Sequence, residues 1–271
     1  MEEFNKKPKK INRRQLLMNS ALAMTAYLLG FNRIPVANAA AETVSPLNQQ
    51  ARIALIIDDI GFSRSIARQF AQLDLPLTFS ILPRLGHTRE LAVELQSRGY
   101  EIMLHQPMEP YNSCCDPGPG ALFVGDNAEK IERILDENIS SLPFAVGMNN
   151  HMGSRFTESA EEIGKTMQVI KTRHLFFIDS LTSSNSIAYA TAREFRLSTA
   201  HRHVFLDNIR NVSTILYQLH QLRRHALKFG RAIGIGHPYS ETATAIGCFA
   251  KRLNRPNISL VSASQLASRS A

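Results

Sequence analysis

Cysteine is scarce in this chain of 271 residues, and long apolar runs are absent. Three cysteines (Cys114, Cys115 and Cys248) are an odd number, which excludes a fully paired disulfide framework, and we interpret them as structural or incidental. No uninterrupted apolar stretch reaches the roughly 18 residues that a membrane-spanning helix needs. The sequence also lacks a glycine-rich phosphate loop and the nucleophile elbow of α/β-hydrolases. What remains, with 44% hydrophobic and 20% charged residues, is typical of a globular core.

The first forty residues differ from the rest. Paired Arg13-Arg14, an apolar segment that ends at Gly30 and the small-residue site Ala37-Asn38-Ala39 follow one another in the order of a secretory signal. The arginine pair resembles a twin-arginine signal, with an ordinary Sec signal or an uncleaved anchor as alternatives. We therefore expect a bacterial protein exported to the periplasm or beyond, with a signal over 1–40, a flexible lead-in over 41–51 and one domain over 52–271.

Positive charge is concentrated in this leader. Residues 1–40 carry seven Lys/Arg and two Glu, so they account for five of the eight net positive charges. The remaining balance of about +3 is too small to indicate nucleic-acid binding. We expect no nucleic-acid partner and no stable membrane span after cleavage, and the sequence does not indicate an oligomeric state.

From Arg52 onward, short apolar runs alternate with amphipathic stretches. The predicted strands are Arg52–Ile57, Leu77–Leu82, Glu101–Leu104, Ala145–Met148, Leu175–Ile178, Ala232–Gly236, Ile258–Val261 and, more weakly, Leu197–Leu206. The predicted helices are Arg64–Leu73, Thr88–Arg98, Ala128–Ser140, Glu158–Lys171, Ile187–Phe195, Val212–Phe229 and Glu241–Leu253, with Asn127 and Thr157 as N-caps. Seven or eight βα units predict a parallel α/β domain, either a barrel, complete or incomplete, or an open doubly wound sheet.

Five predicted strands end on a carboxylate or a histidine. When buried parallel strands finish at one face, the residues at their carboxyl ends converge there. Such a set of acids and imidazoles provides the parts of a metal-assisted hydrolase. The segment Gln106–Gly125, rich in proline and glycine, leaves one of these ends, and we expect it to cover the site. The five strand ends are Asp58-Asp59, His105, Asn149-Asn150-His151, Asp179 and His237, with His201 and His203 as lesser candidates.

Each strand end suggests a role. Adjacent carboxylates repel at a buried site, so one of Asp58 and Asp59 can bind a cation while the other accepts a proton from water; a helix cap or turn is the alternative. His237, with an ordinary pKa near 6.5, suits protonation of a leaving amine. Asp179 would orient an arginine or a histidine.

A second group of polar residues could support these roles. Glu109, four residues after His105, would be a second metal ligand or a substrate contact. Asn149, Asn150 and Arg155 form a polar cluster around His151. Arg155 would orient a carboxylate through its paired donors, or lie in a surface salt bridge.

Six motifs, in order over residues 52–263, resemble the divergent polysaccharide deacetylase family. They are Ile57-Asp58-Asp59-Ile60-Gly61, Leu104-His105-Gln106-Pro107-Met108-Glu109-Pro110, Pro117-Gly118-Pro119-Gly120-Ala121-Leu122, Asn149-Asn150-His151-Met152-Gly153-Ser154-Arg155-Phe156, Phe177-Ile178-Asp179-Ser180 and Gly236-His237-Pro238-Tyr239. The resemblance implies a distorted parallel (β/α) barrel of the NodB-like carbohydrate esterases. These enzymes remove N-acetyl groups from sugars with a divalent metal, usually zinc, held by one Asp and two His.

The family's first motif places the base on Asp58 and a metal ligand on Asp59, and its late motif places the acid on His237. Its metal histidines come as H-x-x-x-H, whereas this chain has His105 followed by Glu109. The third ligand is therefore expected to be His151, with Glu109 as the alternative. We expect a zinc-dependent deacetylase of an N-acetylated envelope or extracellular glycan. A non-catalytic glycan-binding or envelope-assembly protein and, more weakly, a glycoside hydrolase are the rivals.

Overall fold

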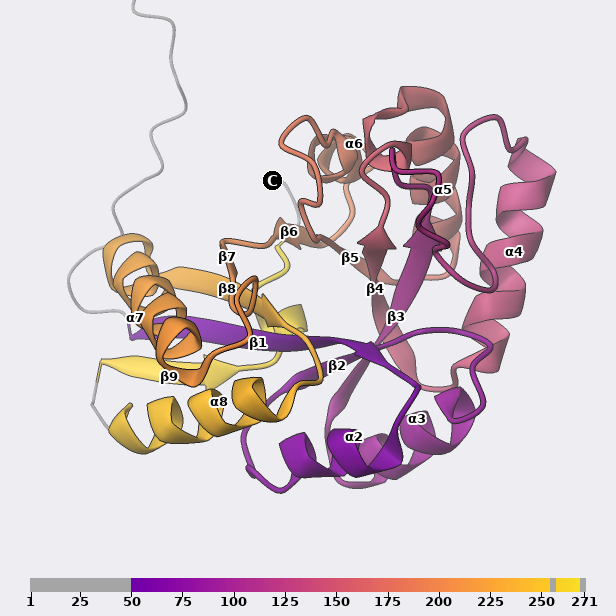
Figure 1. The fold of residues 1–271 in the computed structure, drawn as a ribbon. Helices are drawn as coiled ribbons and strands as arrows, with labels where there is room; N and C mark the ends of the chain where they lie inside the picture. Colours follow the sequence, from indigo (N-terminus) through magenta and orange to yellow (C-terminus); the bar gives the residue numbers. More distant parts are fainter. Residues whose placement is uncertain (1–49, 254–256, 269–271) are drawn as a thin grey trace, which may run out of the picture. The chain divides into compact units, whose positions relative to one another are not determined.

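The computed structural model describes residues 50–253 and 257–268. The predicted signal over 1–40 and nearly all of the lead-in over 41–51 lie outside these residues. The described residues form one curled sheet with helices around its outer side (Figure 1). None of the helices in this part of the chain is long and apolar enough to cross a membrane.

The sheet has nine strands, and all of their pairings are parallel. Its strand order is β6-β5-β4-β3-β2-β1-β8-β7, with β9 paired to β1. The strands are β1 (Ala51–Ile60), β2 (Thr78–Ile81), β3 (Glu101–Met108), β4 (Ala145–Met152), β5 (Phe176–Asp179), β6 (Thr199–His201), β7 (Val204–Phe205), β8 (Arg231–Gly236) and β9 (Ile258–Val261).

The two edge strands of this order show that the sheet is an incomplete barrel. β6 and β7 lie at opposite ends of the order, yet only Arg202 and His203 separate them in the chain. A two-residue connection cannot span an open sheet, so the sheet must curl until its edges approach each other. The predicted barrel is confirmed in this incomplete form, and the open doubly wound alternative is wrong.

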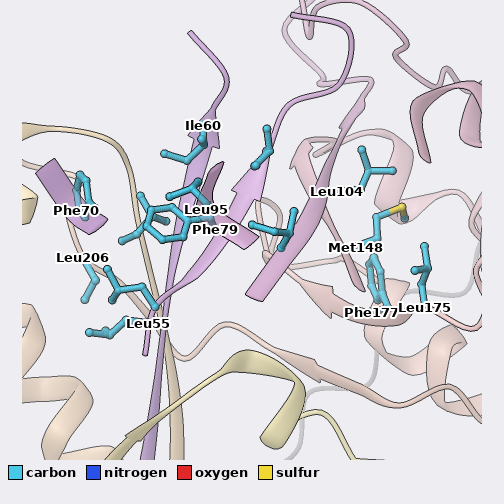
Figure 2. Packing of buried hydrophobic residues seen from close by; sticks show 14 of the residues in the cluster. Leu55, Ile60, Phe70, Phe79, Leu95, Leu104, Met148, Leu175, Phe177 and Leu206 are labelled. Atoms are coloured by element: carbon cyan, nitrogen blue, oxygen red, sulfur yellow. The ribbon is translucent and has the colours of Figure 1, made fainter. Parts of the chain in front are cut away.

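The central strand β1 is buried on both faces. Ile53, Leu55 and Ile57 belong to the core between sheet and helices, whereas Ala54 and Ile56 belong to a second core inside the curl. This alternation follows from the two-residue repeat of a strand. Figure 2 shows side chains of the first core from several elements, among them Leu55, Phe79, Phe70 and Leu95.

The seven predicted helices are confirmed, with ends shifted by two residues at most. Asn127 caps its helix as expected, because its side chain accepts a hydrogen bond from the backbone N–H of Lys130 at 2.9 Å. Thr157 was wrongly predicted as a cap, since a short 3-10 turn intervenes and the cap position falls to Ser159. The helices are α2 (Arg64–Ala71), α3 (Thr88–Ser97), α4 (Ala128–Ser141), α5 (Ala160–Thr172), α6 (Ala188–Glu194), α7 (Val212–Phe229) and α8 (Ser240–Arg252).

Three strands run further than their apolar segments predict. β3 and β4 each continue four residues past the predicted ends, and their polar residues remain in register, with His105 opposite Asn149 and Pro107 opposite His151. β1 likewise includes both aspartates. The carboxyl ends of these strands thus carry polar side chains that are fixed by the sheet itself.

A glycine in β4 offers a test of this packing. A Cβ added at Gly147 would lie 2.4–2.5 Å from the ring atoms of Phe176, whereas one added at Gly164 in α5 meets no atom within 4 Å. Gly147→Ala should therefore destabilise the fold by about 1–3 kcal/mol through overpacking. The matched change Gly164→Ala should stabilise it by roughly 0.5–1 kcal/mol, because alanine favours a helix. Urea unfolding of both variants measures this; equal effects would contradict the described packing.

Candidate active site

Three side chains from β1, β3 and β4 bring potential metal ligands together. The Asp59 Oδ1 atom lies 3.1 Å from His105 Nε2 and 2.9 Å from His151 Nδ1. The two imidazole nitrogens lie 3.2 Å apart. Within the described part of the chain, this trio alone places three acid, imidazole or thiol ligand atoms within 4.8 Å of one another.

The trio fits a divalent cation. Tetrahedral zinc with ligand distances of about 2.0–2.2 Å holds its ligand atoms roughly 3.4 Å apart, close to the spacing here. The Asp59 Oδ1 atom is buried and accepts no well-aligned hydrogen bond, although two ring nitrogens lie beside it. A cation between the three atoms would satisfy that oxygen.

A backbone irregularity lets both aspartates serve this centre. Neighbouring residues of a strand point to opposite faces, so Asp58 and Asp59 would diverge in a regular strand. The register with β2 shifts between Ile57 and Ile60, and Asp59 has a left-handed φ of 56°. This bulge turns the Asp59 side chain toward the side that Asp58 already faces.

Asn149 joins the metal trio to Asp58. Its side-chain oxygen accepts hydrogen bonds from Ser80 Oγ at 2.5 Å and from His105 Nδ1 at 2.8 Å, and its amide nitrogen donates to Asp58 Oδ1 at 2.8 Å. Because Nδ1 donates this hydrogen bond, the Nε2 atom of His105 keeps its lone pair, which faces Asp59 and His151 and is available for a cation. Asn149 is fully buried, so it lies behind the ligands as a support and not at a surface open to substrate.

The two aspartates have opposite electrostatic surroundings. Burial raises the pKa of the Asp58 carboxyl, against the lowering effect of the nearby His105 and His237 charges. Burial acts on Asp59 in the same direction, but the close imidazoles of His105 and His151 outweigh it and hold the pKa of this carboxyl below the usual range. Asp59 is thereby kept ionised as a ligand, and Asp58 is the better proton acceptor.

His237 lies beside the centre and is held by Asp207, a residue to which the sequence analysis gave no role. Its Nδ1 lies 2.9 Å from Asp207 Oδ1, and its backbone N–H donates to Asp207 Oδ2 at 2.6 Å. Its Nε2 is 3.9 Å from Asp59 Oδ2. Burial lowers the pKa of His237, but the bond to Asp207 and the charges of Asp58 and Asp59 outweigh it and raise the value to about 9.

Glu109 and Arg155 lie outside the ligand trio. The Arg155 guanidinium donates to Glu109 Oε1 at 2.6 Å, and Glu109 Oε2 accepts from the backbone N–H of Val124 at 2.7 Å. The arginine side chain is half exposed. The pair ties the end of β3 to the segments before α4 and α5, which is the salt-bridge role that the sequence left open for Arg155.

Asn150 and Asp179 also have structural partners. Asn150 accepts from the Ser180 N–H at 2.9 Å and donates to the Met152 carbonyl at 2.8 Å. Asp179 is fully buried and accepts hydrogen bonds from the N–H groups of Leu181 and Tyr189 and from the Ser186 hydroxyl. Both side chains therefore support the turn that follows β5 and are not brought into the trio.

The gap between β6 and β7 holds a second residue that sequence reasoning missed. The half-buried Arg202 guanidinium donates to the carbonyls of Ser180 and Leu181 and lies 5.0 Å from the Phe205 ring, which itself lies 5.0 Å from His237. His201 and His203, the lesser candidates, stack beside it at 4.7 Å. The Nδ1 of His203 accepts from the Ile233 N–H, and burial lowers its pKa to about 3. Both imidazoles thus pack in the gap, outside the ligand trio.

Comparison with known proteins identifies relatives of the whole domain. Residues 55–267 match a family model described as divergent polysaccharide deacetylase. An uncharacterised Escherichia coli (strain K12) protein, YibQ, is 32% identical over 237 residues, which are 87% of this chain and 73% of that protein. The crystal structure of an uncharacterised Agrobacterium tumefaciens C58 protein has a TM-score of 0.76 at 26% identity and covers 80% of this chain and 89% of its own.

A more distant structure bears on the fold alone. The catalytic domain of a peptidoglycan N-acetylglucosamine deacetylase from Eubacterium rectale ATCC 33656 superposes with a TM-score of 0.52 at 12% identity. The match covers 86% of this chain and 97% of that domain. The curled parallel sheet is thus the NodB-like barrel that the sequence motifs implied.

The hydrogen bond between His237 and Asp207 predicts a measurable titration. The pKa of His237 is about 9 in the folded protein and near 6.5 in the unfolded chain. Protonated His237 therefore stabilises the fold fully below pH 6.5, and this contribution disappears as the pH rises through about 9. Asp207→Asn removes the charge and should lower the His237 pKa toward 6.5. Proton NMR titration of the imidazole in metal-free protein measures it, with the exposed change Asp116→Asn as control. An unaltered His237 titration in Asp207→Asn would refute the assignment.

Proposed function

The chain belongs to the divergent polysaccharide deacetylase family, and we propose that it is a metal-dependent hydrolase that removes N-acetyl groups from an envelope or extracellular glycan. The observation that carries the proposal is the placement of Asp58 and His237 within 4 Å of members of one ligand trio: Asp58 Oδ2 lies 3.7 Å from His105 Nε2, and His237 Nε2 lies 3.9 Å from Asp59 Oδ2. The bond cleaved would be the amide between the acetyl group and the sugar nitrogen. The expected location outside the cytoplasm follows from the predicted signal over residues 1–40.

The trio supplies the electrophilic part of this chemistry. Asp59, His105 and His151 would hold a divalent cation, which we expect to be zinc because the donors are two imidazoles and one carboxylate. When bound, such a cation polarises the amide carbonyl and makes an attacking water more acidic. Asn149 and Ser80 keep His105 in the orientation that this requires.

Asp58 and His237 would move the two protons. Asp58 accepts a proton from the attacking water, and its bond to Asn149 fixes the carboxyl for this task. The water oxygen bonds to the carbonyl carbon, the C–N bond breaks, and His237 gives its proton to the departing amine. The bond to Asp207, together with the charges of Asp58 and Asp59, raises the pKa of His237 to about 9 and keeps it protonated at neutral pH. The products are acetate and a free amino sugar.

Acetate release tests the function. Wild-type protein should release acetate from chitooligosaccharides or peptidoglycan fragments, and Asp58→Asn should slow release by about 10²–10⁴-fold, because a general base contributes that much. Asp116→Asn, an exposed change outside the centre, should act like wild type. Enzymatic acetate assay and mass spectrometry of the glycan follow the reaction.

Other outcomes point to the rival functions. Glycan binding without acetate from wild-type protein would indicate a non-catalytic binding protein. New reducing ends without acetate would indicate a glycoside hydrolase. Equal acetate release by wild type and Asp58→Asn would reject the base assignment while keeping the activity.

Metal content decides the third ligand. Purified protein should contain about one zinc per chain, and His151→Ala should lose most of it, because one donor of the trio is removed. Glu109→Ala should keep its metal, since that carboxylate binds Arg155 and the Val124 N–H. Elemental analysis, after zinc loading and removal of unbound zinc by dialysis, gives the number of zinc ions bound per chain. Loss of metal in Glu109→Ala with retention in His151→Ala would reverse the assignment.

A further inference from the structure

An apolar pocket adjoins the ligand trio. It has a volume of about 240 Å³ and includes Asp59 among its lining residues. Ile60, Phe62 and Ile66 form the part that follows Asp59 in the chain, and Pro238 and Tyr239, directly after His237, form the rest of the apolar wall. The pocket is therefore bounded by the two segments that present the ligand and the proposed acid.

Its few polar groups are already largely engaged. The Ser63 hydroxyl accepts from the Ile66 N–H as the cap of α2 and pairs with Ser65 Oγ at 3.0 Å. The Arg210 guanidinium lies 3.8 Å from the centre of the Tyr239 ring. A sugar ring needs several hydrogen-bonding groups for its hydroxyls, and this wall offers little beyond the Tyr239 hydroxyl. An apolar occupant fits it better.

The wall is also a fixed feature of the fold. Gly61 has a φ of 137°, and a Cβ there would lie 3.0 Å from Leu85 Cδ1 and 3.5 Å from the Leu82 carbonyl oxygen. The turn after Asp59 is thus packed closely against the end of β2. Phe62 is nevertheless 68% exposed, so its ring is accessible to a ligand in the pocket that it lines.

From these observations we propose that the pocket binds the acyl group of the substrate. The protein would then hydrolyse N-acyl sugars with acyl groups several carbons longer than acetyl. This inference rests on the proposed amide hydrolysis. An apolar cavity of about 150 Å³ in another protein holds benzene, so an acetyl methyl would leave most of the present 240 Å³ unfilled. A hexanoyl chain on the scissile carbonyl would extend from the trio along Ile60 and Phe62.

Chain-length dependence tests the proposal. N-acetyl-, N-butanoyl- and N-hexanoyl-chitooligosaccharides should be hydrolysed with kcat/KM rising about three- to fourfold per added methylene, because each buried methylene contributes that factor. Ile66→Phe, which fills the pocket, should reduce the hexanoyl-to-acetyl ratio of kcat/KM at least tenfold. Val93→Phe, an exposed position on α3, is the matched control. A kcat/KM that is flat or falls with chain length overturns the proposal.

Binding gives a readout that needs no turnover. The chain has no tryptophan, so Phe62→Trp places a single tryptophan at the pocket, whose emission can be excited selectively, and Val93→Trp places one elsewhere. N-hexanoylglucosamine should shift the emission of Phe62→Trp to shorter wavelength, whereas N-acetylglucosamine should not, and Val93→Trp should respond to neither.

Failure of the proposed amide hydrolysis and failure of the acyl-pocket assignment give different results. Without hydrolysis of any N-acyl sugar the proposed function fails, and a hexanoyl-specific emission shift would still support the pocket assignment. Equal shifts with both sugars would show that the pocket takes the sugar ring, and no shift with either would show that it takes neither. Both results overturn the acyl assignment.

Discussion

The candidate centre depends on which face of each strand a side chain occupies. Inside the curl, the apolar residues Ile56, Met103 and Ile235 are each followed two positions later by a polar one. That two-residue step carries Asp58, His105 and His237 into the same interior, at the carboxyl ends of β1, β3 and β8. The centre is thus a continuation of the inner core in polar residues.

The same rule explains the positions of the other strand-end residues. Phe177 packs in the outer core, so Asp179, two positions later, also faces outward and supports the turn after β5. Asp59 alternates with Asp58 and would face outward as well. Its left-handed backbone and the local register shift overcome this, and the second carboxylate reaches the ligand trio. An Asp residue adopts a positive φ more readily than most non-glycine residues.

Much of this arrangement could be predicted from the sequence, because strand periodicity and strand ends are local properties. The helices, the central strands and the convergence of Asp58, His105 and His237 follow from apolar runs and the residues after them. Strand length could not be predicted, because β3 and β4 continue through polar residues that hydrogen-bond to partners far away in the chain, such as Ser80 and Asn149. Asp207 follows only the short apolar run Val204–Leu206, so its signal was too weak to stand out.

Burial gives these few polar contacts their effect. Asn149 has one acceptor oxygen and one NH₂ group, and the structure uses both to join a proposed base to a proposed ligand. Asp207 likewise binds both the imidazole and the backbone N–H of His237, and it also accepts a hydrogen bond from the Thr242 hydroxyl. In water such bonds would exchange with solvent, but in a buried site an unpaired polar group is costly, so each pair is held in one arrangement. The opposite proton affinities of the two carboxylates follow from that arrangement. Burial dominates at Asp58 and raises its pKa, whereas two imidazoles in close contact with Asp59 outweigh its burial and lower its pKa.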